Sequence, residues 1–391
     1  MIDLPVKTPA RIVPEYSLTG DLLSFTRCER QYRYYNGSSL PPARPVQMWY
    51  GEFIHAMLEE AFLRWRTTGR PFPWPATPIE DARPGPPPPG TDPHDIRALG
   101  WPIEEVLAHA GKRARSREAR RAAYERATAC INTLGPMLFP LIAASEEKLL
   151  GTRTLPAGPD IPARAEQYGL KGIVDVLSEV TLGDAAADNP LRAAIAEACG
   201  LPKGAYEVIV DYKGTRRPPV SDDPRSDWQL GAWQVLTYAW LRGRQPGARP
   251  IAAGVLLYVN ELAPGGGDHA RLLREVRAGV TDVAPTPNSE DDNKLRAYLA
   301  GTDPELSAAF RMRRAIRVVP VTQVAIDEAV TAFDSIVSRI ETRVTHEAGR
   351  DGIRNVWRAD CEDHDTCVAC DFKRGCEQAV SRGWDRDAAP G

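Results

Sequence analysis

An acidic residue and a lysine stand two positions apart at the end of an apolar stretch, and residues of these types can act on phosphate esters. The stretch spans residues 206–215 and reads YEVIVDYKGT. Its β-branched and aromatic residues predict a buried strand. Because side chains alternate along a strand, Asp211 and Lys213 should project from one face, about 6–7 Å apart. Such a pair could hold a metal ion and the water or phosphate beside it.

The simpler interpretation is a salt bridge at a strand end, since the same spacing occurs elsewhere in the chain. Two further acid-x-Lys pairs are Glu146–Lys148 and Asp371–Lys373. About one such pair is expected by chance among 52 acidic residues. Glu146–Lys148 falls in a segment with a helical pattern and Asp371–Lys373 lies between cysteines, so neither is expected to end a strand.

Three other segments carry polar residues at ordered positions. The motifs GEFIH at 51–55, GIVD at 172–175 and QVLTY at 234–238 accompany VDYK at 210–213. His55 falls in a helix predicted over residues 48–67, and Asp175 ends a β-branched run. Gln234 and Tyr238 are four residues apart in an apolar helix predicted over 228–241, so they share one face.

These four motifs, in this order, resemble those of the PD-(D/E)XK nuclease superfamily in its RecB-like branch, over residues 51–238. The resemblance implies an α/β fold with a restriction-endonuclease-like mixed central sheet flanked by helices. It also implies a helical insertion and a C-terminal, cysteine-rich metal-cluster segment.

The resemblance assigns a role to each motif residue. Asp175 and Asp211 would hold Mg²⁺ or Mn²⁺ through hard carboxylate oxygens, with His55 and the Tyr212 carbonyl as further ligands. Lys213 would orient or help deprotonate the attacking water. Gln234 and Tyr238 would line the site. The alternatives are a core or surface histidine at position 55 and an ordinary core tyrosine at position 238.

The cysteines give a second signal. Four of the seven lie between Cys361 and Cys376, which in a reducing compartment favours metal binding over disulfides. The spacing resembles that of the iron–sulfur nucleases, including AddB and the CRISPR adaptation nucleases. That resemblance implies a [4Fe-4S] cluster that joins the chain ends, held by Cys28, Cys367, Cys370 and Cys376.

A structural zinc site is the alternative for the same segment. Cys361 could join the three C-terminal cysteines without Cys28, and His364 widens the choice of ligands. Cys130 and Cys199 are expected to be bystanders.

Composition limits the class of protein. The chain has 391 residues, of which 43% are hydrophobic and 26% charged, as in a soluble globular protein. No apolar run approaches the roughly 20 residues of a membrane span, and the first 25 residues lack a signal-peptide core. We therefore expect a cytoplasmic protein without a membrane partner.

The net charge of −3 means that any nucleic-acid surface must be local. The best candidate is an arginine-rich run that includes Arg113, Arg117, Arg120 and Arg121, which could grip a phosphate backbone. The ordinary interpretation of such a run is a solvated helix face.

Hydrophobic patterns and proline content divide the chain into four parts. Residues 1–69 should hold N-terminal helices, 70–150 a proline-rich linker and basic helical insertion, 151–290 the nuclease core, and 291–391 C-terminal helices with the cluster segment. Helices are predicted over 17–36, 291–314 and 321–347, and over 103–150 with an interruption at Gly135 and Pro136. Strands are predicted over 251–260 and 270–280, with a hairpin over 163–179 turning near Gly169.

The function that the resemblance implies is metal-dependent hydrolysis of DNA, as an exonuclease on single strands or DNA ends. Because the sequence lacks the P-loop pattern GxxxxGK[ST], any ATP-driven unwinding would come from a partner helicase or a larger DNA-processing or defence complex. Alternatives are a non-catalytic DNA-binding scaffold that keeps the fold and cluster, an RNA-directed or defence nuclease, and a zinc-bound regulatory protein.

Overall fold

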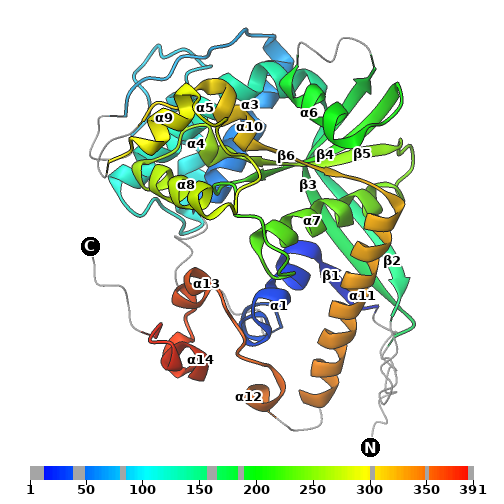
Figure 1. Cartoon of the computed structure of the whole chain (residues 1–391). Coiled ribbons are helices and arrows are strands. Elements are labelled where there is room, and N and C mark those ends of the chain that lie inside the picture. Colours follow the sequence, from blue (N-terminus) through cyan, green and yellow to red (C-terminus); the bar gives the residue numbers. More distant parts are fainter. Residues whose placement is uncertain are drawn as a thin grey trace, which may run out of the picture.

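A mixed six-stranded sheet lies at the centre of the structure, a computed structural model that describes residues 13–37, 49–79, 85–155, 165–183, 189–299, 304–347 and 352–385. The strand order is β1-β3-β4-β5-β6, with β2 paired to β3 (Figure 1). The strands are β1 (Glu15–Ser17), β2 (Ile142–Thr154), β3 (Gln167–Leu182), β4 (Gly204–Lys213), β5 (Ile251–Tyr258) and β6 (Ile316–Pro320).

Strand directions follow from the connections. β3 is antiparallel to both β2 and β4, whereas β4 and β5 are parallel. Parallel neighbours need a crossover, and the helix α7 (Asp227–Arg242) supplies it between β4 and β5. Both faces of β4 are therefore covered, which explains its nearly continuous apolar sequence.

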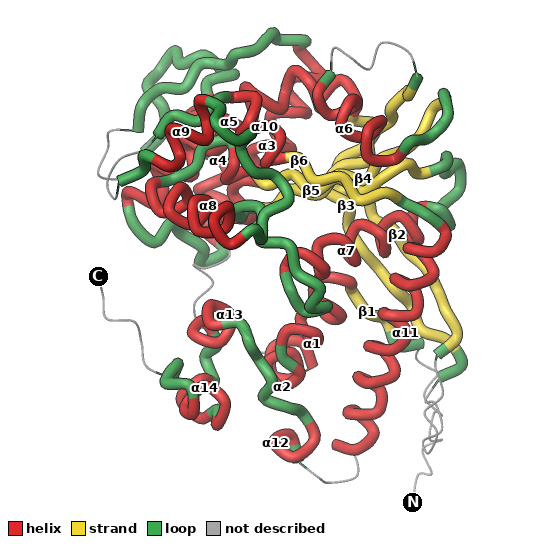
Figure 2. The backbone as a smooth tube through the Cα atoms, viewed as in Figure 1, coloured by secondary structure: helices red, strands yellow, loops and turns green. Residues whose placement is uncertain are grey.

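Helices cover both faces of the sheet. Val208 and Val210 of β4 pack in one core with α3 (Trp49–Thr68), α4 (Ile96–His109) and α5 (Arg117–Leu138). Ile209 faces the other way, into a core with α7 and α11 (Gln323–His346). Figure 2 shows the sheet between these two groups of helices. The expected α/β fold, a mixed sheet flanked by helices, is confirmed at this level.

Shorter helices complete the described chain: α1 (Ser24–Arg27), α2 (Glu29–Tyr32), α6 (Pro190–Cys199), α8 (Gly266–Ala278), α9 (Glu290–Arg296), α10 (Ala308–Ala315), α12 (Ile353–Val356), α13 (His364–Ala369) and α14 (Glu377–Ser381). Within the described ranges, no helix has the length and apolar character that crossing a membrane requires.

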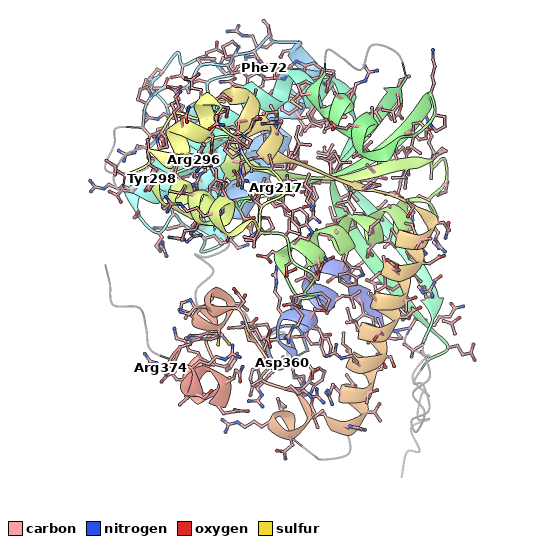
Figure 3. All side chains as sticks on the ribbon, in the orientation of Figure 1. Phe72, Arg217, Arg296, Tyr298, Asp360 and Arg374 are labelled. Atoms are coloured by element: carbon pink, nitrogen blue, oxygen red, sulfur yellow. The ribbon has the colours of Figure 1, made fainter. Side chains whose placement is uncertain are left out.

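The two ends of the described chain pack against each other. The Arg30 guanidinium donates to the Trp357 carbonyl at 3.0 Å and to the Glu377 carboxylate at 2.7 Å. Glu29 is fully buried and is held by Arg339 and Arg343 of α11, at 2.7 and 2.9 Å. Asp360, labelled in Figure 3, accepts the backbone N–H of Glu29 at 3.2 Å. These contacts place α1 and α2 beside the C-terminal segment.

Several predicted elements differ from the structure. The predicted end of the helix over 103–150 is wrong, because β2 begins at Ile142 and extends the sheet. The hairpin expected near Gly169 is wrong as well, because Gly169 lies inside the single long strand β3, opposite Glu15 of β1. The strand expected over 270–280 is the helix α8, which buries Leu272 and Leu273.

Three predicted helices are interrupted. The helix expected over 103–150 is divided into α4 and α5 at residues 110–116, whereas α5 runs through Gly135 and Pro136, where the break was expected. Residues 17–36 form a π-helical segment followed by α1 and α2, with an extended Cys28 between them (φ −163°, ψ 113°). The helix expected over 291–314 is divided into α9 and α10. In contrast, α3, α7 and α11 begin and end within about two residues of their predicted limits, a spread usual for helix ends.

Candidate active site

A single cavity of about 610 Å³ brings together the residues that the four motifs singled out. It lies where β3 and β4 meet the helices α3 and α7. Its lining includes His55, Asp175, Asp211, Tyr212, Lys213, Gln234 and Tyr238. Positions far apart in the chain therefore meet at one place, as the motif order predicted.

The register of the sheet explains how the carboxylates meet. Val176 pairs with Val210, which places Asp175 opposite Asp211 on β4. On the other side of β3, Ser145 pairs with Val176 and Glu147 with Val174, which places Glu146 opposite Asp175. Three acidic residues thus form a row across three neighbouring strands, and all three line the cavity.

This row concentrates negative charge. Like charges directly opposite one another destabilise a sheet, and the Asp175 and Asp211 side chains are only 14% and 4% exposed. Burial, with a further contribution from the charge of Asp211, raises the pKa of Asp175 well above its ordinary value of 3.8. The row therefore favours a proton or a cation, and a divalent ion would neutralise it more completely.

Asp211 is held from two sides. The Lys213 ammonium lies 2.7 Å from Asp211 Oδ2, and the Gln234 amide donates to Asp211 Oδ1 at 2.7 Å. Lys213 also donates to Gln234 Oε1 at 2.6 Å. Within the described chain, Oδ2 is buried and accepts no hydrogen bond of good geometry.

His55 contacts the two strands from α3. Its Nε2 atom lies 2.9 Å from the Tyr212 carbonyl oxygen, and its Nδ1 atom lies 3.5 Å from Asp175 Oδ2. The same Asp175 oxygen accepts the backbone N–H of Tyr212 at 2.7 Å. The predicted oxygen and nitrogen ligands therefore contact one another directly at the end of β4.

The glycine of the GIVD motif has a packing role. A Cβ atom added at Gly172 would lie 2.5 Å from Cε1 of Tyr238, so only glycine allows the tyrosine ring to rest on β3. Tyr238 is 2% exposed, and its hydroxyl lies 3.3 Å from the Gln234 amide. It supports the glutamine that holds Asp211 and Lys213.

Glu146 is the site residue that the sequence prediction missed. Its pair with Lys148 was set aside because the segment was expected to be helical, yet both residues line the cavity from β2. Glu146 has a φ of 51°, a left-handed conformation that is uncommon outside glycine and that often marks functional sites. Burial and the nearby Glu59 raise its pKa. The acid-x-Lys spacing is the sequence signal that could have identified Glu146, but the residue pattern of β2 predicts a helix there and not a strand.

No protein-family model and no curated protein matches the chain. Six chains of solved structures match it. One, described as "Crystal structure of SSO0001", shares 13% identity over 83% of this chain and 95% of its own, with a TM-score of 0.24. Agreement this low does not establish a shared fold.

The candidate metal ligands have a suitable chemistry. Carboxylate and carbonyl oxygens suit Mg²⁺ and Mn²⁺, and an imidazole suits Mn²⁺. No three His, Cys, Asp or Glu side chains among the described residues have a geometry ready to hold a metal ion. In the candidate site Asp175 accepts the Tyr212 N–H and Asp211 accepts from the Gln234 amide. Three carboxylates in one row, beside the Tyr212 carbonyl, are a donor set that fits a divalent cation.

A second pocket, of about 260 Å³, collects five cysteines from the two ends of the chain. They are Cys28, Cys361, Cys367, Cys370 and Cys376. All are free thiols, and burial raises the pKa of Cys361 to about 12. A thiol with so high a pKa becomes a thiolate when a metal binds it. The donor set suits an iron–sulfur cluster or zinc, and both the Cys28 and the Cys361 alternative remain compatible with it.

The other two cysteines lie outside this pocket. Cys130 is buried in the core between α5 and the sheet, and Cys199 packs against the same core.

The four arginines predicted to bind nucleic acid lie in the α4–α5 region, outside the candidate site. Arg113, Arg117 and Arg121 are exposed. Arg120 instead points inward and is held by Glu104, with Nε and Nη2 contacts of 2.7 and 2.6 Å. Because that guanidinium is already paired and buried, we assign Arg120 a structural role.

Replacing Glu146 by glutamine should weaken Mn²⁺ binding about tenfold or more, because it removes one charge from the acidic row. Isothermal titration calorimetry measures the effect. The control is Glu147→Gln, which removes the same charge from the adjacent residue without touching the cavity lining. Equal affinities in the two variants would exclude Glu146 from the ion site.

Ionisation of Asp175 should lower the free energy of unfolding of the metal-free protein as the pH rises. Because its folded-state pKa is raised, its contribution to stability is complete below about pH 3.8 and is lost as the pH rises through the folded-state value. Urea unfolding in EDTA should therefore show a decline with pH that Asp175→Asn lacks. Parallel pH profiles for the two proteins would contradict the account.

Proposed function

We propose that the chain is a divalent-metal-dependent DNA nuclease of the PD-(D/E)XK type. The observation that carries the proposal is the row of Glu146, Asp175 and Asp211 beside Lys213 in one cavity. A salt bridge at a strand end needs one acid for one base, and this site holds three carboxylates in adjacent strands. Lys148, Lys171 and Arg27 also line the cavity, so the negative charge is local to the row. Carboxylates gathered in this way are the ligands that a cation-dependent phosphate chemistry requires.

Asp175 and Asp211 would hold the ion, with His55 and the Tyr212 carbonyl as further ligands. Mg²⁺ or Mn²⁺ bound there would polarise the phosphodiester and lower the pKa of a water molecule. In the hydrolysis, the water oxygen bonds to phosphorus and the bond from phosphorus to the leaving sugar oxygen breaks. The water loses one proton and the leaving oxygen gains one, so the reaction needs no further reactant.

Lys213 is placed to act on the phosphate. Its ammonium is held by Asp211 and Gln234, and its side chain is 24% exposed in the cavity. A fixed cation with access to the substrate can orient the attacking water and offset the negative charge that develops on the phosphate oxygens. Gln234 keeps both Asp211 and Lys213 in position, and Tyr238 supports Gln234.

We also propose a substrate, a partner protein and a structural metal for the chain. By resemblance, we assign single-stranded DNA or duplex ends as substrate, with a helicase or a larger DNA-processing complex as partner. The five-cysteine pocket would hold a [4Fe-4S] cluster, or zinc, that joins the chain ends. A reducing cytoplasm would keep those thiols available.

The test is cleavage of oligonucleotides labelled at the 5′ or the 3′ end, single- or double-stranded, in Mg²⁺ or Mn²⁺. The proposal predicts metal-dependent products, and the position of the label in the products gives the polarity. Binding without cleavage in either metal would identify a non-catalytic DNA-binding subunit instead. Cleavage of RNA but not of DNA would identify an RNA-directed nuclease instead.

A further inference from the structure

A second large cavity lies in the insertion between α4 and α5. Its volume is about 610 Å³, and it is separate from the candidate active site in its lining. The end of α4, the turn at 110–116 and the first turn of α5 form its wall. Its lining includes Trp49, Trp101, Lys112, Arg113, Arg117 and Arg121.

Cations outnumber acids around this cavity. Five basic and three acidic residues line it: Lys112, Arg113, Arg117, Arg120 and Arg121 against Glu104, Glu105 and Glu118. Arg120 neutralises Glu104 inside the wall. Arg113 and Arg117 are exposed and form no salt bridge within the described chain. Lys112 is paired with Glu52 and Arg121 with Glu125, so the exposed Arg113 and Arg117 are the cations that would attract an anion such as a phosphate.

An aromatic ring accompanies the charges. Trp101 is half-buried and lines the cavity, and within the described chain its ring contacts no other aromatic ring. Trp49 differs, because it is 3% exposed and stacks on Phe53 with ring centres 4.9 Å apart. Aromatic faces beside arginines are the features with which proteins hold single-stranded nucleic acids.

The helix α3 connects this cavity to the active site. Lys112 donates to Glu52 at 2.6 Å, and Glu52 is three residues, about one helical turn, before His55. Trp49, at the start of the helix, lies about 9 Å along its axis from His55. Both cavities therefore border α3, within about two turns of each other along its axis.

We propose that the α4–α5 cavity is a binding site for single-stranded DNA, which holds the strand beside the active site. One base would stack on Trp101, and phosphates would contact Arg113 and Arg117. The choice of DNA as ligand rests on the proposed function. The insertion then determines which strand is presented to the acidic row.

Fluorescence anisotropy with a labelled single-stranded oligonucleotide, in EDTA and at several salt concentrations, tests this site. Trp101→Ala should weaken binding about fivefold or more, the loss of one stacked base. Arg117→Ala should weaken binding and reduce the slope of log affinity against log salt by about 0.7, the contribution of one phosphate contact. The matched control is Arg115→Ala, an exposed arginine two residues before Arg117 that does not line the cavity.

The outcomes separate this site from the nuclease proposal. Trp101→Phe should recover most of the lost affinity, whereas a folding defect would lower the melting temperature of both Trp101 variants. Unchanged binding in Trp101→Ala and Arg117→Ala, or an equal loss in Arg115→Ala, would overturn the site. Because no cleavage occurs in EDTA, the result stands even if the chain hydrolyses nothing.

Discussion

Replacing Lys213 by alanine is expected to lower the rate of DNA cleavage by about 10²- to 10⁴-fold, the usual contribution of a positioned acid–base or charge-stabilising group. The substitution removes the cation that lies 2.7 Å from Asp211 and 2.6 Å from Gln234. Binding of DNA should change little, because Lys213 is one of several cations. Single-turnover rates at saturating enzyme, beside anisotropy in EDTA, separate the two effects.

Lys148→Ala is the matched control for this prediction. Lys148 lines the same cavity and belongs to the second acid-x-Lys pair, but it lies on β2 with an exposed side chain. Its loss should affect the binding of substrate more than the single-turnover rate. If Lys148→Ala abolished cleavage and Lys213→Ala did not, the catalytic lysine would belong to the Glu146 pair.

Replacing Cys367 by alanine is expected to remove the bound metal and to destabilise the chain by several kcal/mol. The five-cysteine pocket joins α1 and α2 to the C-terminal segment, and a cross-link over so long a loop is worth on the order of 5 kcal/mol. Anaerobically purified protein should be brown and contain about four irons per chain. Metal analysis and urea unfolding measure both effects.

Single cysteine variants then decide between the two ligand sets. With the cluster held as proposed, Cys28→Ala loses iron and Cys361→Ala keeps it. Cys130→Ala is the control, because Cys130 is a buried thiol of the core outside the pocket. Stoichiometric zinc without iron, with Cys361 essential and Cys28 dispensable, would show a local zinc site instead.

Local patterns predicted the elements that are strongly apolar. β4 and α7 are buried on their packing faces, so hydrophobic residues recur at the period of each element and identify it. Their motif residues, Asp211, Lys213, Gln234 and Tyr238, were therefore placed correctly relative to one another. Which strand lies opposite which depends on the whole sheet, and the sequence alone did not show that Asp175 reaches Asp211.

β2 shows why part of the site was missed. Within the described ranges it pairs only with β3, and it buries just Leu149 among its 13 residues. An irregular register near Ala144 and the left-handed Glu146 break the alternation that identifies a strand. The strand prediction for α8 was wrong for a different reason. Its apolar residues Leu272, Leu273 and Val276 pack on a small separate core, but polar residues also recur at alternate positions, as they do in a strand.

The central claim is that the acidic row holds a divalent ion with which the chain cleaves DNA. The most direct test compares the wild type with Asp211→Asn for Mn²⁺-dependent release of labelled product from a single strand. We predict steady cleavage by the wild type, none in EDTA, and a loss of at least 10²-fold in Asp211→Asn. Equal cleavage by both proteins, or none by a wild type that binds the strand, would contradict the account.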